Sequence, residues 1–166
     1  MSRILVLVRH AKPERSAASG RDFDRELTPG GLAAVQGAYP TTFALLARLL
    51  PQGARPRVWS SPAVRARQTA AVAADALGVD AREVELHEVL YAQDEAAFMD
   101  ELDASGERCV VAVGHIPFME SLPRLLGGVE LDFGPGAVCA LALPDEEDRP
   151  ADLLFFVQGP AVGEGA

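Results

Sequence analysis

The run Ile4–Val8 constrains the fold more than any other feature of this 166-residue chain. It consists of five consecutive apolar residues, three of them β-branched, which predicts a strand buried on both faces of a sheet. Such strands are typical of open α/β sheets, where ligands bind at the carboxyl ends of the strands. Because Arg9 and His10 follow the run directly, we expect this cation and imidazole to lie at a ligand site.

Two further strand-to-helix transitions resemble the first. Cys109–Val113 is a second apolar run, and it ends at Gly114 and His115 before a helix that we expect from Pro117 to about Leu126. Residues 57–61 predict a shorter strand, followed by a helix over 63–77 with Ser61 as its N-cap and Gly78 as its stop.

The remaining segments complete an alternating pattern. Thr28 is a suitable N-cap for a helix that reaches Leu50, with a kink or a division at Pro40. Residues 84–90 predict a short strand or extended segment, and 94–102 a helix capped by Asp94. Strands over 137–143 and 153–157 flank an acidic turn, which favours an antiparallel hairpin.

This alternation predicts one α/β domain: a mostly parallel sheet with helices on both faces and one antiparallel edge strand. We expect the domain to span residues 1–158 and residues 159–166 to form a flexible tail. No apolar run is long enough for a signal-peptide core or a membrane span, so we expect a cytoplasmic protein without membrane contact. Cys109 and Cys139 fall in apolar runs and are expected to be buried, reduced thiols.

The charge of the chain limits its partners. The net charge is −9, which argues against nucleic acid as a partner, because nucleic acid binding needs a basic face. A site for an anionic ligand must therefore be a local basic cluster within an acidic molecule. The oligomeric state does not follow from the sequence.

The strand ends place four such residues together. Arg9 and His10 follow the first strand, His115 follows Cys109–Val113, and Arg65 lies in the first turn of the helix over 63–77. Two histidines and two guanidinium groups beside helix N-termini suit a phosphoryl group, whose oxygens accept paired hydrogen bonds. A metal site is the competing interpretation of the histidines, but a fixed cation at Arg9 would repel a divalent ion.

Three ordered motifs resemble those of the histidine phosphatase superfamily, also called the phosphoglycerate mutase-like family. Val8–Ala11 is similar to its Arg-His-Gly motif, with Ala11 in place of the usual glycine. Ser60–Ala70 is similar to its Ser-Pro-x-x-Arg-Ala-x-Gln-Thr segment, and Val113–Pro117 to its Gly-His-x-Pro segment. The short chain and the stretch over 25–31 resemble the compact SixA-type phosphohistidine phosphatases.

The resemblance implies a phosphoglycerate mutase-like fold and metal-independent catalysis without a cofactor. It implies that His10 is the nucleophile and that Arg9, Arg65 and His115 hold the phosphoryl oxygens. Glu88 lies where the resemblance places a leaving-group acid.

Lys12 and Ser16 are further candidates for the phosphate pocket, with solvation in the loop as the alternative. The expected substrate is phosphohistidine of a protein. The alternatives are a small phosphorylated metabolite or a non-catalytic phosphate-binding module. The acidic cluster over 22–26 is expected to be a solvated, internally paired turn.

Overall fold

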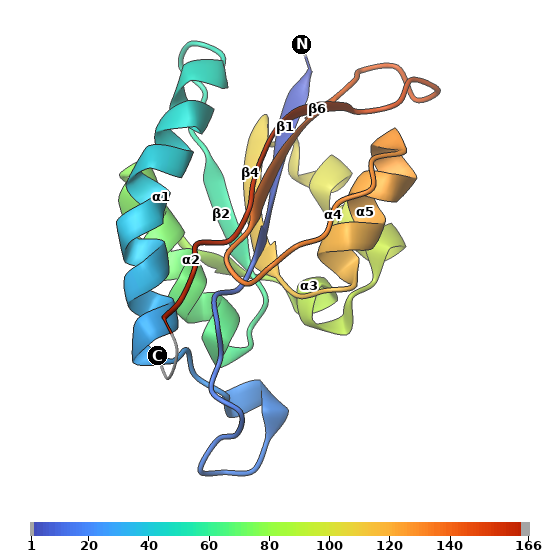
Figure 1. Ribbon diagram of the computed structural model, residues 1–166. Coiled ribbons are helices and arrows are strands. Elements are labelled where there is room, and N and C mark those ends of the chain that lie inside the picture. The colour runs from blue at the N-terminus through green and yellow to red at the C-terminus, as the bar shows by residue number, and fades with distance from the viewer. Residues whose placement is uncertain (1, 164–166) are drawn as a thin grey trace.

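The computed structural model describes residues 2–163 and places a six-stranded sheet between two layers of helices (Figure 1). The strands, in the spatial order β3-β2-β4-β1-β5-β6, are β1 (Arg3–Arg9), β2 (Arg57–Ser60), β3 (Glu85–Leu86), β4 (Cys109–Gly114), β5 (Val138–Leu143) and β6 (Asp152–Val157). The α-helices are α1 (Pro29–Leu49), α2 (Val64–Leu77), α3 (Glu88–Ala92), α4 (Glu95–Ser105) and α5 (Phe118–Gly127). Two 3₁₀ turns, η1 (Asp22–Asp24) and η2 (Ala81–Glu83), complete the regular structure of the described residues.

The sheet is mixed, and its strands β3, β2, β4 and β1 are parallel. β5 pairs antiparallel with β1 and with β6. The predicted α/β architecture and terminal hairpin are therefore confirmed. The strand that opposes the others is β5, one position inside the edge, because the chain reaches it from α5 and then turns back through the hairpin to form β6.

Alternate residues of β1 pack on opposite faces of the sheet, as the apolar run predicts. Val6 and Val8 belong to the core beneath α1 and α2, whereas Leu5 and Leu7 belong to the core beneath α4 and α5. Figure 1 shows these two helix layers on either side of the strands. Burial on both faces fixes the register of β1, and so fixes where its carboxyl end points.

The two cysteines are free and buried, as predicted. Cys109 lies in the core beneath α1 and α2, and Cys139 in the core on the other face of the sheet. Burial raises the pKa of each thiol to about 12, so both remain protonated.

The N-terminus of α1 is capped as the sequence indicates, since the Thr28 hydroxyl accepts a hydrogen bond from the Gly31 amide at 2.9 Å. Pro40 does not divide the helix, which continues to Leu49. Pro40 lies on the exposed side, while Tyr39 and Phe43 beside it are buried in the core. Their packing holds the two halves of α1 in one helix.

Two local predictions are corrected. Only Glu85–Leu86 of the segment 84–90 is a strand, and α3 begins at Glu88. Ser61 is not the N-cap of α2: Ala63 occupies that position, and the Ser61 hydroxyl accepts a hydrogen bond from the Ala63 amide at 3.3 Å.

The C-terminal segment is only partly described. Residues 159–163 have no regular secondary structure, and Gly159 and Pro160 are half-buried. Residues 164–166 of the predicted tail lie outside the described residues. The domain boundary at residue 158 thus stays a prediction. Within residues 2–163, no helix has the length and apolarity to cross a membrane.

Candidate active site

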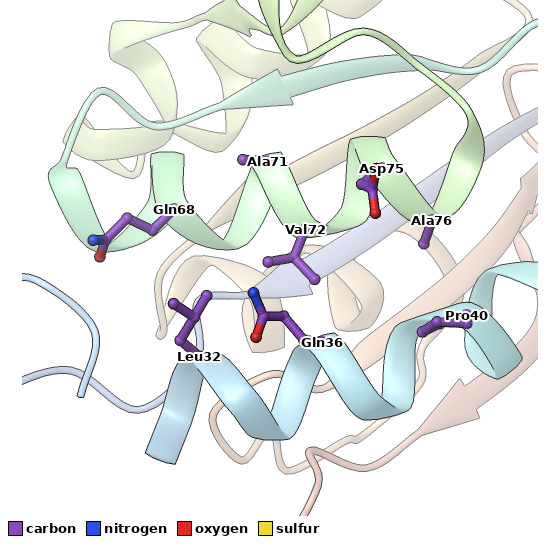
Figure 2. A pocket seen from close by; sticks show the side chains of 8 residues that line it. All are labelled: Leu32, Gln36, Pro40, Gln68, Ala71, Val72, Asp75 and Ala76. Carbon is purple, nitrogen blue, oxygen red and sulfur yellow. The ribbon is translucent and has the colours of Figure 1, made fainter. Parts of the chain in front are cut away.

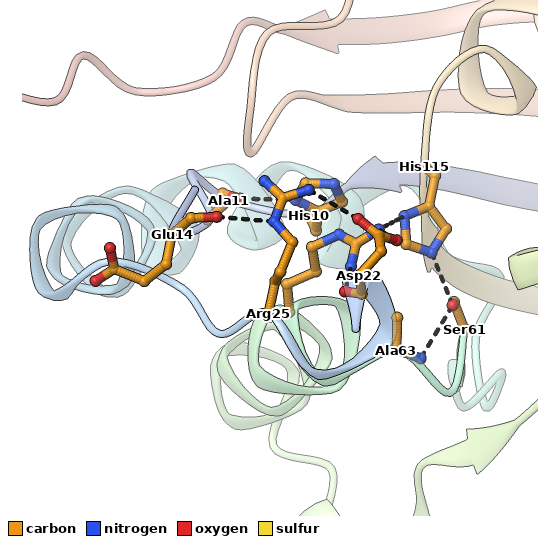
Figure 3. A network of polar contacts seen from close by, with 9 residues as sticks. His10, Ala11, Glu14, Asp22, Arg25, Ser61, Ala63 and His115 are labelled. Carbon is orange, nitrogen blue, oxygen red and sulfur yellow. Dashed lines mark hydrogen bonds and ion pairs between the residues drawn. The ribbon is translucent and has the colours of Figure 1, made fainter. Parts of the chain in front are cut away.

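A cavity of about 510 Å³ lies at the carboxyl edge of the parallel strands. It is lined by Arg9, His10, Pro13, Asp22, Arg25, Arg65, Tyr91, Gln93, His115 and Ile116. The four residues that the strand ends predicted are all among them, and we call these four, Arg9, His10, Arg65 and His115, the floor. We call Asp22, Arg25, Tyr91 and Gln93 the rim. Figure 3 shows His10 and His115 of the floor together with Asp22 and Arg25 of the rim.

His10 is held directly at the end of β1. Its amide donates to the Gly114 carbonyl of the neighbouring strand at 3.0 Å. Its ring Nδ1 lies 2.7 Å from the Ala11 carbonyl oxygen. Because a carbonyl oxygen only accepts, this contact assigns the proton to Nδ1 and leaves the lone pair on Nε2.

The pKa of His10 is lowered to about 3, first by burial and further by the positive charges around it, although the Ala11 carbonyl opposes the shift. The imidazole is therefore neutral near physiological pH, as a nucleophile must be.

The two floor arginines are each held by a hydrogen bond to a backbone carbonyl. Nη1 of Arg9 donates to the Phe133 carbonyl at 2.7 Å, and Nη1 of Arg65 donates to the Asp22 carbonyl at 2.8 Å. Nε of each guanidinium is buried and has no hydrogen-bond partner among the described residues. Buried N–H donors normally have acceptors, so these two Nε groups mark a place that suits an anion.

His115 closes the floor opposite His10, with the ring centroids 5.3 Å apart. Its Nε2 lies 2.8 Å from the Ser61 hydroxyl, and its Nδ1 lies 3.5 Å from Nη2 of Arg65. Since an arginine nitrogen only donates, Nδ1 is the acceptor and Nε2–H donates to Ser61. Burial, and then the charge of Arg65, lower the pKa of His115 to about 4.

Helix α2 connects the floor to two loops through the residues that follow Arg65. The Thr69 hydroxyl accepts from the Ala11 amide at 3.0 Å and donates to the Arg65 carbonyl at 2.9 Å. The side-chain oxygen of Gln68 accepts from the Leu27 amide at 2.7 Å. The Gln-Thr pair of this segment thus fixes the loop that follows His10.

The rim contains residues that the sequence analysis missed. Asp22 and Arg25 do pair, at 2.9 Å, as an internally paired turn would. Asp22 also contacts Arg65, with 3.0 Å between its Oδ2 and Nη2, so this turn lines the cavity instead of standing free in solvent. The only available signal was its high charge density, which is also typical of solvated loops.

The other two rim residues come from α3 and its end. The ring of Tyr91 meets His115 edge-on, with the centroids 5.7 Å apart. Gln93 adopts a positive φ of 56°, and its side-chain oxygen accepts from the Phe118 amide at 3.0 Å. Because residues 84–90 were expected to be a short strand or extended segment, Tyr91 could not be placed at the cavity from the sequence.

Three candidates are not among the residues that line this cavity. Glu88 is exposed at the first position of α3. Ser16 is exposed in the loop after β1, and Lys12 is half-buried, with its carbonyl accepting from the Thr28 amide. The role of Glu88 stays a prediction from the resemblance, and the roles of Lys12 and Ser16 stay predictions from their place in the loop after His10.

A second cavity, of about 370 Å³, lies between α1 and α2 (Figure 2). Leu32, Val72 and Ala76 supply much of its apolar wall. Its described lining contains no histidine or arginine, so it offers no counterpart to the basic floor. Elsewhere in residues 2–163, no group of three or more His, Cys, Asp or Glu residues is arranged to hold a metal ion.

A neutral imidazole beside two anchored guanidinium groups, at the carboxyl edge of an α/β sheet, defines a phosphoryl-transfer site. The family model of the histidine phosphatase superfamily (branch 1) matches residues 5–101, more than half of the chain. The chain belongs to this superfamily and is a hydrolytic phosphatase. The match includes Arg9, His10 and Arg65, and His115 lies beyond it.

Solved structures show the same relationship. A candidate phosphohistidine phosphatase, SixA from Agrobacterium tumefaciens, is 26% identical with a TM-score of 0.72, over 95% of this chain and 98% of that one. A second candidate SixA, from Nakamurella multipartitia, is 27% identical with a TM-score of 0.71, over 97% and 98%. A mycobacterial glucosyl-3-phosphoglycerate phosphatase shares the fold at 18% identity with a TM-score of 0.65, over 97% and 100%. A search of curated proteins found no match.

Proposed function

We propose that this phosphatase acts through a phosphohistidine intermediate on His10 and that its substrate is phosphohistidine of a protein. The observation that carries the proposal is the hydrogen bond from Nδ1 of His10 to the Ala11 carbonyl, which leaves Nε2 as an unprotonated nucleophile inside a basic cavity. Arg9, Arg65 and His115 surround it.

The reaction has two steps. In the first, the lone pair of Nε2 forms a bond to phosphorus while the bond to the leaving group breaks. The Nε groups of Arg9 and Arg65 then hold the equatorial oxygens, where negative charge gathers in the transition state. In the second step, a water oxygen attacks phosphorus and the N–P bond breaks, with its electron pair returning to Nε2, so that His10 is again neutral. The two protons of the water leave on the released phosphate as dihydrogen phosphate, which gives one of them to the solvent.

The choice of leaving group follows from the acids at the cavity. Asp22 is the only carboxylic residue in its described lining. The hydrogen bond from Arg25, followed by the contacts with Arg65, keeps the pKa of Asp22 below its usual value despite some desolvation. This carboxylate is therefore ionised and unsuited to protonate a leaving group.

A substrate whose leaving group needs no strong acid fits such a site best. An alkoxide from a phosphomonoester must be protonated as it departs. The imidazole of phosphohistidine can carry a proton on its second ring nitrogen and depart as a neutral molecule. This chemistry favours a phosphoramidate, in agreement with the similarity of the chain to two candidate SixA phosphohistidine phosphatases.

A protein substrate is favoured by the exposure of the rim. The side chain of Asp22 is 54% exposed, directly above Arg65, which is 7% exposed. A phosphorylated side chain projecting from another protein could thus reach the floor past a solvent-facing rim.

The test is a panel of substrates measured with and without EDTA: a phosphohistidine protein, a phosphoserine peptide and p-nitrophenyl phosphate. We expect metal-independent turnover, fastest on phosphohistidine and slowest on phosphoserine. Faster turnover of phosphoserine would contradict the leaving-group argument. Phosphate binding without turnover of any of the three would instead indicate a binding module.

A further inference from the structure

Asp22 makes an unusual contact with the floor. It contributes two acceptors to one guanidinium group: its carbonyl oxygen lies 2.8 Å from Nη1 of Arg65, and its Oδ2 lies 3.0 Å from Nη2. A single residue of η1 thus occupies the outer edge of Arg65. Figure 3 shows Asp22 in the centre of this network, between Arg25 and His115.

The opposite edge of the guanidinium faces away from Asp22. Nε of Arg65 is buried without a partner among the described residues, and Nη2 lies 3.5 Å from Nδ1 of His115. Because one Nη2–H is donated to Asp22 and the other is directed at His115, Nε–H is the donor that Arg65 has left for a phosphoryl oxygen. This edge therefore belongs to the floor, next to His115.

The second carboxylate oxygen extends the contact across the rim. Oδ1 of Asp22 accepts from Nη1 of Arg25 at 2.9 Å, and Nε of Arg25 donates to the Glu14 carbonyl at 2.8 Å. Arg25 in turn holds Asp22, so the carboxylate is fixed from both sides. Among the described residues, Arg65 is the only floor residue that donates a hydrogen bond to Asp22.

We propose that Asp22 is a positioning residue of the phosphatase reaction, which orients the guanidinium of Arg65 before the substrate arrives. The inference rests on the proposed function, because it assumes that Arg65 binds the reacting phosphoryl group. A long side chain loses rotamer freedom when it binds a ligand, and a guanidinium that is already fixed loses less. Asp22 itself does not touch the reacting atoms.

Two variants separate orientation from charge. Asp22→Ala removes both side-chain acceptors, whereas Asp22→Asn keeps one oxygen that can accept from Nη2 of Arg65, and removes the charge and the acceptor that faces Arg25. Asp24→Asn is the matched control, because Asp24 belongs to the same turn, pairs with Ser19 and Arg21, and is not among the cavity-lining residues. The measurements are kcat and KM for p-nitrophenyl phosphate, the inhibition constant of inorganic phosphate, and the melting temperature.

For Asp22→Ala we expect kcat to fall by about tenfold to a hundredfold, since a misoriented group weakens the transition state more than the ground state. Inorganic phosphate should bind within about threefold of its affinity for the wild type, because the loss of orientation weakens binding while the removal of a negative charge from the cavity strengthens it. Asp22→Asn should recover most of kcat, and Asp24→Asn should match the wild type.

Other outcomes would overturn the inference. A higher kcat in Asp22→Ala would make Asp22 a competitor of the phosphoryl group for Arg65. A loss in Asp22→Asn that is confined to poor leaving groups would make Asp22 a general acid. Weaker phosphate binding together with a lower melting temperature would reduce its role to holding the loop.

A measurement without turnover distinguishes this inference from the proposed function. The Nε–H signal of Arg65 in an NMR spectrum, assigned with Arg65→Lys, should shift when inorganic phosphate is added to the wild type or to Asp22→Asn. It should shift less in Asp22→Ala. This pattern in a protein that hydrolyses no substrate would refute the function and keep the positioning role, whereas equal shifts in all three proteins would refute the positioning role itself.

Discussion

The floor and the rim of the cavity are built from different kinds of structure. His10, Arg65 and His115 are 5–6% exposed and lie at the ends of long strands or in the first turn of a fourteen-residue helix. The rim comes from a three-residue 3₁₀ turn and a five-residue helix, and the side chain of Asp22 is 54% exposed. The floor is rigid because the sheet fixes it, whereas the rim is held by a few side-chain contacts.

This difference predicts that the floor and the rim contribute to different parts of the reaction. Buried groups whose positions are fixed before binding stabilise a transition state most effectively, because they need not reorganise during the reaction. Groups at an exposed rim meet the part of the substrate that lies beyond the phosphoryl group. Changes in the floor should therefore lower kcat for every substrate, and changes in the rim should have smaller and more substrate-dependent effects.

The largest expected effect belongs to His10. His10→Asn should lower turnover of p-nitrophenyl phosphate by at least about a thousandfold, since no other group can form the covalent intermediate. Rapid acid quenching should show no labelled phosphoenzyme in the variant, while the wild type should carry an acid-labile, base-stable adduct. The control is His87→Asn: this third histidine stacks on Trp59 and does not line the cavity. Substantial turnover by His10→Asn would exclude His10 as the nucleophile.

The second largest effect is expected for Arg65. Arg65→Lys keeps the charge but loses the paired donors and both contacts with Asp22, so we expect kcat/KM to fall by about a hundredfold. Arg67→Ala, two residues along the same helix and exposed, should change kcat/KM by less than about twofold. An equal loss in both variants would show that charge near the helix N-terminus matters and that the floor geometry does not.

The floor should also make stability depend on pH. The pKa values of His10 and His115 are lowered from 6.5 to about 3 and about 4, so between these values and 6.5 the unfolded chain binds more protons than the folded one. The free energy of unfolding should therefore have its full value above about pH 6.5. It should fall as the pH decreases, by up to about 1.4 kcal/mol per pH unit for each histidine.

Urea unfolding between about pH 7 and about pH 5 measures this slope. In His10→Asn one titrating group is gone, so the slope should fall by about half. A slope that does not change in the variant would show that His10 is not a buried neutral imidazole.

The same contrast between floor and rim explains which residues of the site could be predicted from the sequence. Ile4–Val8 and Cys109–Val113 are apolar runs, which are typical of strands buried on both faces of a sheet. The carboxyl ends of these strands, and with them His10 and His115, could therefore be placed from the sequence. The positions of Asp22 and Tyr91 could not be predicted in this way. Their positions depend on how short segments fold onto the finished sheet, and charge density in a loop has the same pattern whether the loop is solvated or lies over a cavity.

The smallest expected effect belongs to Glu88, which precedes the rim residues of α3 and tests where the leaving-group acid comes from. The family resemblance suggested it as a leaving-group acid, yet it is exposed and outside the cavity lining. We therefore expect Glu88→Gln to change kcat by less than about twofold for p-nitrophenyl phosphate and for phosphoserine alike. A loss confined to phosphoserine would establish Glu88 as an acid that reaches the substrate after α3 moves. Equal, small effects would exclude Glu88 as the acid and would leave the ionised Asp22 as the only carboxyl group in the described lining, which is the condition under which phosphohistidine is the favoured substrate.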